Sequence, residues 1–247
     1  MTIVMSYGGG RQSAAIICLV DNGLLPKPDY IVMADTGREA ATTWRYTDAV
    51  IKPILQRLGI EFHLAGHELA EADLYYNNGD LLIPAFTIDG KLPTFCSTEW
   101  KSRVFRRYCR RALNLNSATV WFGMSLDEVD RMRVSDVKWL QNHYPLIFDV
   151  PMRAHECIDY VKKCGLPEPP RSSCWCCPHR RNAEWRLLRD EANEDFVKAC
   201  DLDDEIREKD TRGGVWLHES RLPLREVDLD HEPENAQLDL CANFCWT

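Results

Sequence analysis

The chain has 247 residues, of which 45% are hydrophobic, and its formal net charge is −8. This length supports one sizeable α/β core with a small appended lobe. The negative charge argues against a general basic coat for nucleic acid but leaves room for a local basic patch. No stretch approaches the roughly 18 apolar residues of a membrane-spanning helix, and no basic segment precedes an apolar run as in a signal peptide. We therefore expect a soluble, cytoplasmic protein.

Apolar strands and amphipathic helices alternate along the first two thirds of the chain. Short apolar runs predict strands, and a 3.6-residue periodicity predicts helices, the second of which Pro53 is expected to kink. The expected order is strand 2–6, helix 12–22, strand 30–34, helix 42–58, strand 61–64, a basic helix 99–113, strand 118–122 and helix 154–164. This alternation predicts an α/β fold with a doubly wound, mostly parallel sheet and helices on both faces.

Two stretches depart from this alternation. Residues 65–95 are polar and irregular, and we expect a mobile loop region there. From Pro167 the composition changes to prolines, a cysteine cluster and charged helices. We therefore predict a main domain over residues 1–165 and a small helical, cysteine-containing lobe over residues 166–247. This lobe is expected to pack over the carboxyl ends of the strands.

A glycine-rich segment joins the first strand to the first helix. Gly8, Gly9 and Gly10 let the backbone approach a ligand closely and adopt positive φ angles. The start of the helix adds free N–H groups and the positive end of the helix dipole, and the hydroxyls of Ser6 and Ser13 can donate to the same anion. An ordinary tight turn would use the same residues. The position after the first strand of an α/β unit favours phosphate binding.

A second polar turn, Asp35-Thr36-Gly37-Arg38-Glu39, directly follows the second strand. Open α/β sheets bind ligands at the carboxyl ends of their strands, so this turn and the glycine-rich segment are expected to meet at one edge. A plain turn before a capped helix is the alternative for this segment taken alone.

Positive charge is concentrated on the predicted basic helix. Its six basic residues are Lys101, Arg103, Arg106, Arg107, Arg110 and Arg111. They fall on more than one face, so most of them are expected to form a solvated surface. The functional alternative is a patch for phosphate or nucleic acid.

Eleven cysteines are many for a cytoplasmic chain, in which thiols stay reduced. Metal binding or thiol chemistry therefore explains them better than a disulfide framework. Cys174 and Cys177 have metal-chelating spacing, Cys241 and Cys245 form another close pair, and Cys96 precedes the basic helix. Four thiolates would hold a 4Fe–4S cluster or a structural zinc ion, and free thiols without metal are the alternative.

The remaining cysteines give weaker signals. Cys18 lies in an apolar helical run and is expected to pack in the core. Cys164, like Cys157 and Cys200, lies in a helical pattern without a partner at ligand spacing. None of them is predicted to bind a metal.

The motifs together resemble the PP-loop, adenine nucleotide alpha-hydrolase-like superfamily. Within it they resemble the phosphoadenylyl-sulfate (PAPS) and adenylyl-sulfate (APS) reductases. The glycine-rich segment is similar to S-x-G-G-x-x-S, the second turn to D-T-G, and residues 95–103 to a C-T-x-x-x-K stretch. Residues 123–131 are similar to G-x-x-x-x-E-x-x-R. Residues 172–180 and 217–224 are similar to S-x-C-x-x-C-P-x-R and L-H-x-S-x-x-P-L in phage-encoded and DNA-phosphorothioation relatives, so the resemblance covers nearly the whole chain.

By this resemblance the chain binds an adenine nucleotide, which would be ATP, APS or PAPS. The implied binding residues are Ser6, Gly8, Gly9, Gly10, Gln12, Ser13, Asp35, Thr36, Gly37, Glu39, Lys101, Arg103, Gly123, Glu128 and Arg131, with Thr43 further along. Lys101 is the implied anion contact and Arg103 the second. Gly123, Glu128 and Arg131 would face the nucleotide or brace the loop.

The resemblance also favours a 4Fe–4S cluster over zinc. The implied ligands are Cys96, Cys174, Cys177 and one of Cys241 or Cys245. Cys176 lies between the paired cysteines and is expected to point away.

The implied activity is reductase-like sulfur or redox chemistry, by an oxidoreductase or sulfurtransferase. Lys101, Asp35 and the tail thiol Cys245 would be its catalytic groups. The chain departs from the family in two places, because Gln12 stands where ATP pyrophosphatases carry Asp and the reductase tail signature E-C-G-I-H is absent. One alternative is an ATP pyrophosphatase-type adenylating enzyme. Another is a non-catalytic accessory module with a structural metal, which binds nucleotide and, through the basic helix 101–111, a nucleic-acid or nucleoprotein partner.

Overall fold

The computed structural model describes residues 1–210 and 213–231 and contains a five-stranded sheet in the order β3-β2-β1-β6-β7. The strands are β1 (Thr2–Ser6), β2 (Tyr30–Ala34), β3 (Glu61–Ala65), β6 (Ala118–Phe122) and β7 (Leu140–His143). Every neighbouring pair runs parallel. The predicted α/β class with a parallel sheet is therefore confirmed.

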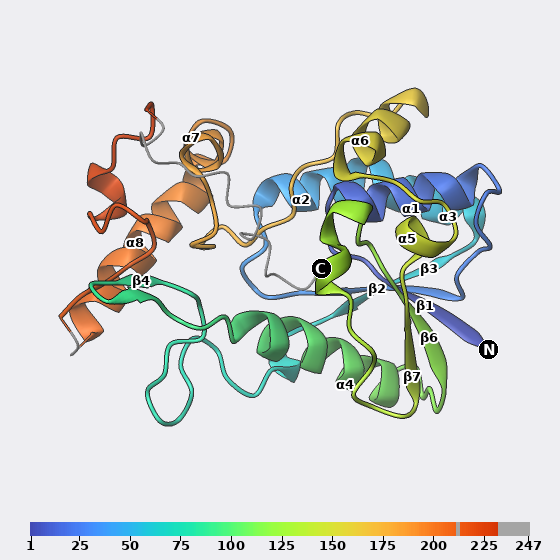
Figure 1. Cartoon of the computed structure of the whole chain (residues 1–247), viewed down its shortest axis with the longest axis horizontal. Coiled ribbons are helices and arrows are strands. Elements are labelled where there is room, and N and C mark those ends of the chain that lie inside the picture. Colours follow the sequence, from blue (N-terminus) through green and yellow to red (C-terminus); the bar gives the residue numbers. More distant parts are fainter. Residues whose placement is uncertain (211–212, 232–247) are drawn as a thin grey trace.

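Helices cover both faces of this sheet (Figure 1). One face carries α1 (Arg11–Asp21), α2 (Ala41–Tyr46), α3 (Lys52–Leu58), α5 (Pro145–Phe148) and α6 (Ala154–Lys163), and the other carries α4 (Val104–Arg111). Successive side chains of a strand point to opposite faces of the sheet, and each face has its own hydrophobic core. Met5 therefore packs on the α1 side and Val4 on the α4 side.

Two helices expected to be continuous are interrupted by π-helical turns. Thr47–Ile51 separates α2 from α3, and Ser97–Arg103 precedes α4. The first interruption has a local cause, since Pro53 lies in the first turn of α3 and has no N–H to donate to the preceding turn.

The C-terminal lobe is built from two separate stretches of chain. It contains α7 (Asn182–Glu191) and α8 (Asn193–Lys209). A small antiparallel sheet is added by β4 (Phe86–Thr87), which pairs with both β5 (Gly90–Lys91) and β8 (Val215–Trp216). Residues 65–95, where a mobile loop region was expected, thus contribute to this lobe. Leu81, Leu82 and Ile83 are buried in the same apolar cluster as α7 and α8, a long-range contact that the irregular local pattern does not encode.

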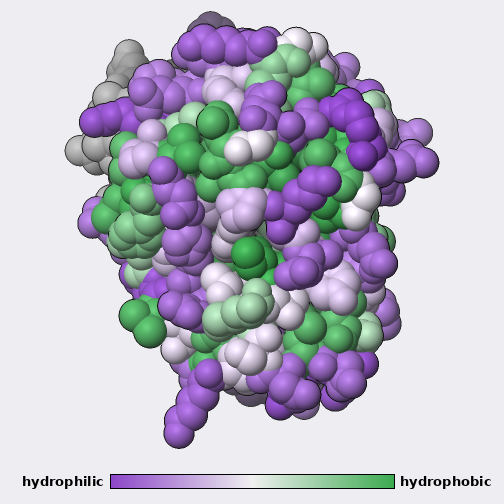
Figure 2. Space-filling model, turned by 90° about the vertical axis from the view of Figure 1, so that its right-hand side faces the viewer, coloured by the Kyte–Doolittle hydropathy of each residue, from purple (hydrophilic) through white to green (hydrophobic). Residues whose placement is uncertain are grey.

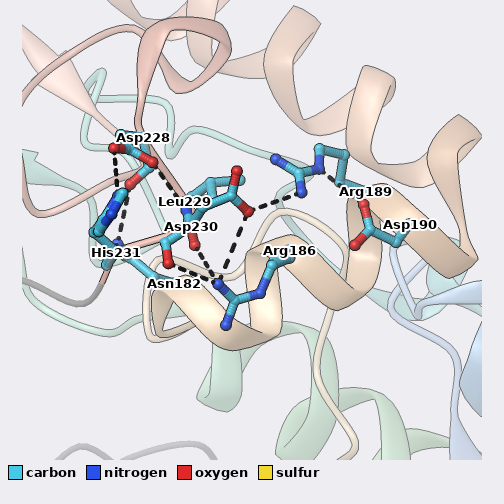
Figure 3. A network of polar contacts seen from close by, with 8 residues as sticks. All are labelled: Asn182, Arg186, Arg189, Asp190, Asp228, Leu229, Asp230 and His231. Carbon is cyan, nitrogen blue, oxygen red and sulfur yellow. Dashed lines mark hydrogen bonds and ion pairs between the residues drawn. The ribbon is translucent and has the colours of Figure 1, made fainter.

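Polar contacts fix the last described residues against α7 (Figure 3). The Asn182 amide donates to the backbone carbonyls of Asp228 and His231. Arg186 donates to the carbonyls of Leu229 and Asp230 at 3.0 and 3.1 Å. The described part of the chain therefore ends beside α7, and the predicted ligands Cys241 and Cys245 lie outside the described residues.

The surface at the amino ends of the strands lies opposite the C-terminal lobe. On this face hydrophobic side chains form several groups that hydrophilic side chains separate (Figure 2). Among the described helices, none combines the length and the apolar character that crossing a membrane requires.

Asp203 is expected to be a main stabilising residue of the lobe. Its carboxylate is fully buried, accepts the backbone N–H groups of Leu217 and Leu224 at 2.7 and 3.0 Å, and pairs with Arg207. Asp203→Ala should lower the free energy of unfolding by about 3 kcal/mol, because two buried donors and a cation lose their acceptor. The matched control is Asp204→Ala. Asp204 is 39% exposed and also pairs with Arg207, so its loss should cost less than about 1 kcal/mol. Equal losses in urea unfolding would contradict this role.

Candidate functional site

The candidate site lies where β1 and β6 meet at the carboxyl edge of the sheet. The connection after β1 passes over the α1 face, whereas the chain enters β6 from α4 on the opposite face. Such a switch point opens a crevice between two adjacent strands, and open α/β sheets bind ligands there. Figure 1 shows that these carboxyl ends point toward the lobe of α7 and α8.

A cavity occupies this position, below the glycine loop (residues 7–10) and beside α4. Its walls are largely apolar and its rim carries polar and charged groups. It is lined by Ser6, Tyr7, Gly8, Met33, Ala34, Glu39, Lys101, Ser102, Phe105, Arg106, Val120, Phe122, Leu140 and Asn142. The structure thus brings the glycine loop, the end of β2, Glu39 and Lys101 to one cavity. An apolar cleft with a few convergent polar groups is the usual form of a small-molecule site.

The glycine loop is closely covered by two other segments. Gly9 has a φ of 74°, and a Cβ atom there would overlap with the methyl group of Thr43. A Cβ at Gly10 would lie 3.1 Å from that of Ser172. The loop therefore needs glycine both for its conformation and for the close approach of α2 and of the cysteine segment.

Three polar atoms beside this loop are buried without a hydrogen-bond partner among the described residues. They are the hydroxyl oxygens of Thr43 and Ser172 and the Nε of Arg11. Buried polar groups are normally hydrogen-bonded, because an unpaired one costs roughly 1–3 kcal/mol. Their gathering around three glycines at a helix N-terminus is therefore typical of an anion site. Ser172 was not among the predicted binding residues, although it begins the S-x-C motif.

The turn after β2 lies between the cavity and the cysteine segment. Its Asp35 carboxylate accepts the Gly37 N–H at 2.8 Å and so shapes the turn itself. Glu39 is buried, accepts the Thr36 hydroxyl at 3.4 Å and lies 3.7 Å from the ammonium of Lys101. Lys101, the predicted anion contact, is thus held at the cavity wall by a buried carboxylate.

The cysteine segment is joined to the same turn by backbone contacts. Glu39 and Cys174 form an isolated antiparallel bridge, and the Trp175 N–H donates to the Arg38 carbonyl at 2.8 Å. The Thr36 hydroxyl also contacts the Cys174 sulfur at 3.4 Å. These bonds place the Cys174 thiol directly behind the turn that lines the cavity.

The predicted Gly123–Arg131 group braces the loop from the other side. Gln12 donates from its side chain to Glu128 at 3.0 Å. Glu128 also caps the short helix Leu126–Arg131 and pairs with Arg131. Gly123 lets β6 end close to α1, since a Cβ there would lie 2.9 Å from the Ser13 hydroxyl. Of the two roles expected for Glu128, this geometry favours bracing the loop.

The cysteines predicted as ligands are only partly within the described residues. Cys96 and Cys174 are buried in the apolar cluster of the lobe, and Cys177 packs against it. Across residues 1–210 and 213–231, no three His, Cys, Asp or Glu side chains form a group that could hold a metal ion. Burial raises the pKa of Cys176 to about 12, so without metal this residue is a neutral thiol at neutral pH.

Most positive charges of the predicted basic helix are paired locally. Arg103 binds Glu99 and Glu71, and Arg106 forms a bidentate pair with Asp136. Arg107 pairs with Glu71, whereas Arg110 lies over the ring of Trp139. This pairing reduces the charge available to a phosphate backbone, and a nucleic-acid partner stays a prediction. Arg103, predicted as the second anion contact, is not among the residues that line the cavity.

Alanine variants of two glycines should distinguish the free-energy cost of a positive φ angle from the cost of a steric clash at the glycine loop. Gly9 and Gly23 have nearly the same φ, 74° and 71°, but an added Cβ at Gly23 would meet nothing within 4 Å. Gly23→Ala should therefore cost about 1 kcal/mol of unfolding free energy. Gly9→Ala should cost at least 2 kcal/mol more, because Thr43 must move. Equal thermal-unfolding shifts for the two variants would contradict this packing.

No protein-family model matches the chain. An uncharacterized nin region protein, ORF290, of Escherichia phage lambda is 26% identical over 196 residues, which cover 66% of this chain and 67% of that protein. The phosphate complex of phosphoadenylyl-sulfate (PAPS) reductase from Candida auris has a TM-score of 0.46 and 13% identity, and the match covers 68% of this chain and 75% of the reductase. The U34-tRNA thiolase NcsA from Methanococcus maripaludis, with its 4Fe–4S cluster, has a TM-score of 0.43 and 15% identity over 89% of this chain and 77% of the thiolase.

Proposed function

We propose that this chain binds an adenine nucleotide, with the phosphates on the glycine loop and the base in the adjoining cavity. The observation that carries the proposal is the pair of buried hydroxyls, Thr43 and Ser172, beside Gly9 and Gly10, which have no hydrogen-bond partner within residues 1–210 and 213–231. A phosphate oxygen accepts hydrogen bonds from both hydroxyl and backbone donors, and so would satisfy them together.

Charge at the loop supports an anionic ligand. The first turn of α1 begins directly after Gly10, and no side chain caps it. The free N–H groups and the dipole of this helix end favour a phosphate. Lys101 lines the adjoining cavity, where it pairs with the buried carboxylate of Glu39 at 3.7 Å, so a phosphate there would compete with Glu39 for the ammonium group.

The lining of the cavity supports an aromatic base next to the phosphates, and the cavity, which measures about 40 Å³ without ligand, must widen to admit one. Met33, Val120 and Phe122 provide apolar surface, and Asn142 provides an amide at the end of β7. A flat, apolar base with hydrogen-bonding edges suits such a lining.

The reaction we propose is reductase-like sulfur or redox chemistry, or activation of a substrate by the nucleotide. The buried thiol of Cys174 behind the Thr36–Glu39 turn supports the sulfur reaction. Gln12 is engaged with Glu128 and offers no carboxylate to a metal ion, which argues against the ATP pyrophosphatase alternative. The test is to incubate the protein with ATP, APS and PAPS and to measure binding, pyrophosphate, AMP and sulfite. Absence of binding to all three would overturn the nucleotide proposal, and binding without any product would favour the accessory module.

Two threonine variants test the phosphate contact. Thr43→Val removes a buried hydroxyl that has no partner among the described residues. It should leave the unfolding free energy unchanged or raise it by up to about 1 kcal/mol, while nucleotide binding should weaken about tenfold because one hydrogen bond to a charged group is lost.

The control is Thr47→Val, one turn further along the same helical segment. Thr47 donates to the Thr43 carbonyl at 2.8 Å and contacts the Tyr7 hydroxyl at 3.1 Å. Its loss should lower the unfolding free energy by about 1–2 kcal/mol and leave the dissociation constant within about twofold of the wild-type value. Thr43→Val protein that binds nucleotide as tightly as wild type would contradict the proposed contact.

We also propose that Cys96, Cys174 and Cys177, with Cys241 or Cys245, hold a metal group. The described thiols fit in residue type, since thiolates are the usual ligands of zinc and of iron–sulfur clusters. They lie in or against one apolar cluster, but without metal no three of the described side chains form a group that could hold an ion, so binding requires the thiols to move together. A 4Fe–4S cluster would supply electrons or bind sulfur there, and zinc would stabilise the lobe.

Two neighbouring cysteine variants test the metal proposal. Protein purified without oxygen should contain iron and absorb broadly in the visible range, or contain zinc and be colourless. Cys174→Ala should lose most of the metal, whereas Cys176→Ala should keep it, because Cys176 lies between the two cysteines of the chelating pair and is expected to point away from the metal. Metal-free wild-type protein, or equal loss in both variants, would contradict these ligands.

A further inference from the structure

Two cysteines that are distant in sequence meet where α1 packs against α6. Cys18 is buried in α1, and Cys164 follows the last turn of α6 and is partly exposed. Both belong to the apolar core on this face of the sheet. Neither residue has a role in the proposed nucleotide or metal site.

Asn22 fixes the position of the Cys164 sulfur. Its side-chain amide donates to that sulfur at 3.3 Å and to the Tyr160 hydroxyl at 2.9 Å. Asn22 stands four residues after Cys18 at the end of α1, and its backbone N–H donates to the Cys18 carbonyl. Residues four apart on a helix lie on one face, so the Cys164 sulfur lies over the face that carries Cys18.

Direct interaction between the two thiols agrees with this geometry. Burial and the neighbouring Cys164 thiol raise the pKa of Cys18 to about 12. Cys18 is buried and Cys164 is partly exposed, so an oxidant reaches Cys164 first. The raised pKa of Cys18 makes its attack on an oxidised Cys164 slow at neutral pH.

We propose that Cys18 and Cys164 form a reversible disulfide that staples α1 to the end of α6 under oxidising conditions. With hydrogen peroxide as oxidant, the Cys164 sulfur takes one oxygen to give a sulfenic acid and releases water. The Cys18 sulfur then attacks it, an S–S bond forms, and the hydroxyl leaves as a second water after taking up the proton from Cys18. Two thiols are oxidised and one peroxide is reduced.

The disulfide would act on α1, the helix that begins at the glycine loop. The start of α1 already touches the segment after α6, because Arg11 lies 3.7 Å from Glu168, and Glu168 also pairs with Lys162. A disulfide would fix the other end of α1 to the same segment. Because it closes a long loop in the unfolded chain, it should stabilise the protein.

The test is to treat the reduced full-length protein with peroxide and to map its cysteine-containing peptides. We expect one cross-link between the Cys18 and Cys164 peptides, a mass loss of about 2 Da, a rise of several degrees in the unfolding temperature, and reversal by dithiothreitol. Cys164→Ser is partly exposed and should fold, and it should lose the cross-link and the temperature shift. Cys109→Ala, on the opposite face of the sheet, should keep both.

Persistent sulfenic or more highly oxidised Cys164 beside a free Cys18 would overturn the proposal. So would unreacted thiols at both positions, or a cross-link from either residue to a different cysteine. None of these outcomes depends on nucleotide binding, so the proposal can fail while the proposed function stands.

Discussion

Gly9 is held in a left-handed conformation against the methyl group of Thr43, and Gly10 lies against Ser172. This close packing is the constraint on which the site depends. This packing brings α2, which covers the main sheet, and the segment around Ser172, which belongs to the C-terminal lobe, against the same glycine loop. A Cβ atom on Gly9 would overlap with the methyl group of Thr43, and one on Gly10 would press against Ser172, so either substitution would require these segments to shift.

The same packing joins the proposed nucleotide site to the thiols. The Thr36–Glu39 turn forms a wall of the cavity on one side and bonds to the Cys174 backbone on the other. Any ligand that orders this turn also orders the cysteine segment, since the two share main-chain hydrogen bonds. An enzyme that brings a nucleotide and a sulfur centre together requires such a junction.

Polar groups that have hydrogen-bond or ion-pair partners, and buried polar groups that have no described partner, lie in different parts of the molecule. Arg106 and Arg107 of α4 and the carboxylate of Asp203 have their partners within the fold, and their role is stability. The hydroxyls of Thr43 and Ser172 are buried without described partners beside the loop. A folded protein keeps buried hydroxyls without hydrogen bonds where a bound ligand supplies the missing acceptor.

The sequence by itself determined the parallel α/β class, because apolar strands and periodic helices alternate along the chain, and it located the glycine loop and the turn after β2 at strand ends. Local pattern carries this information, since strand and helix periods are properties of neighbouring residues. Only the tertiary structure decided that residues 81–83 complete the C-terminal lobe, that Ser172 covers Gly10, and that Cys18 meets Cys164. It also decided that most charges of the basic helix are paired locally. These contacts join residues far apart in the chain, and their geometry is set by how the layers pack, which no short-range pattern records.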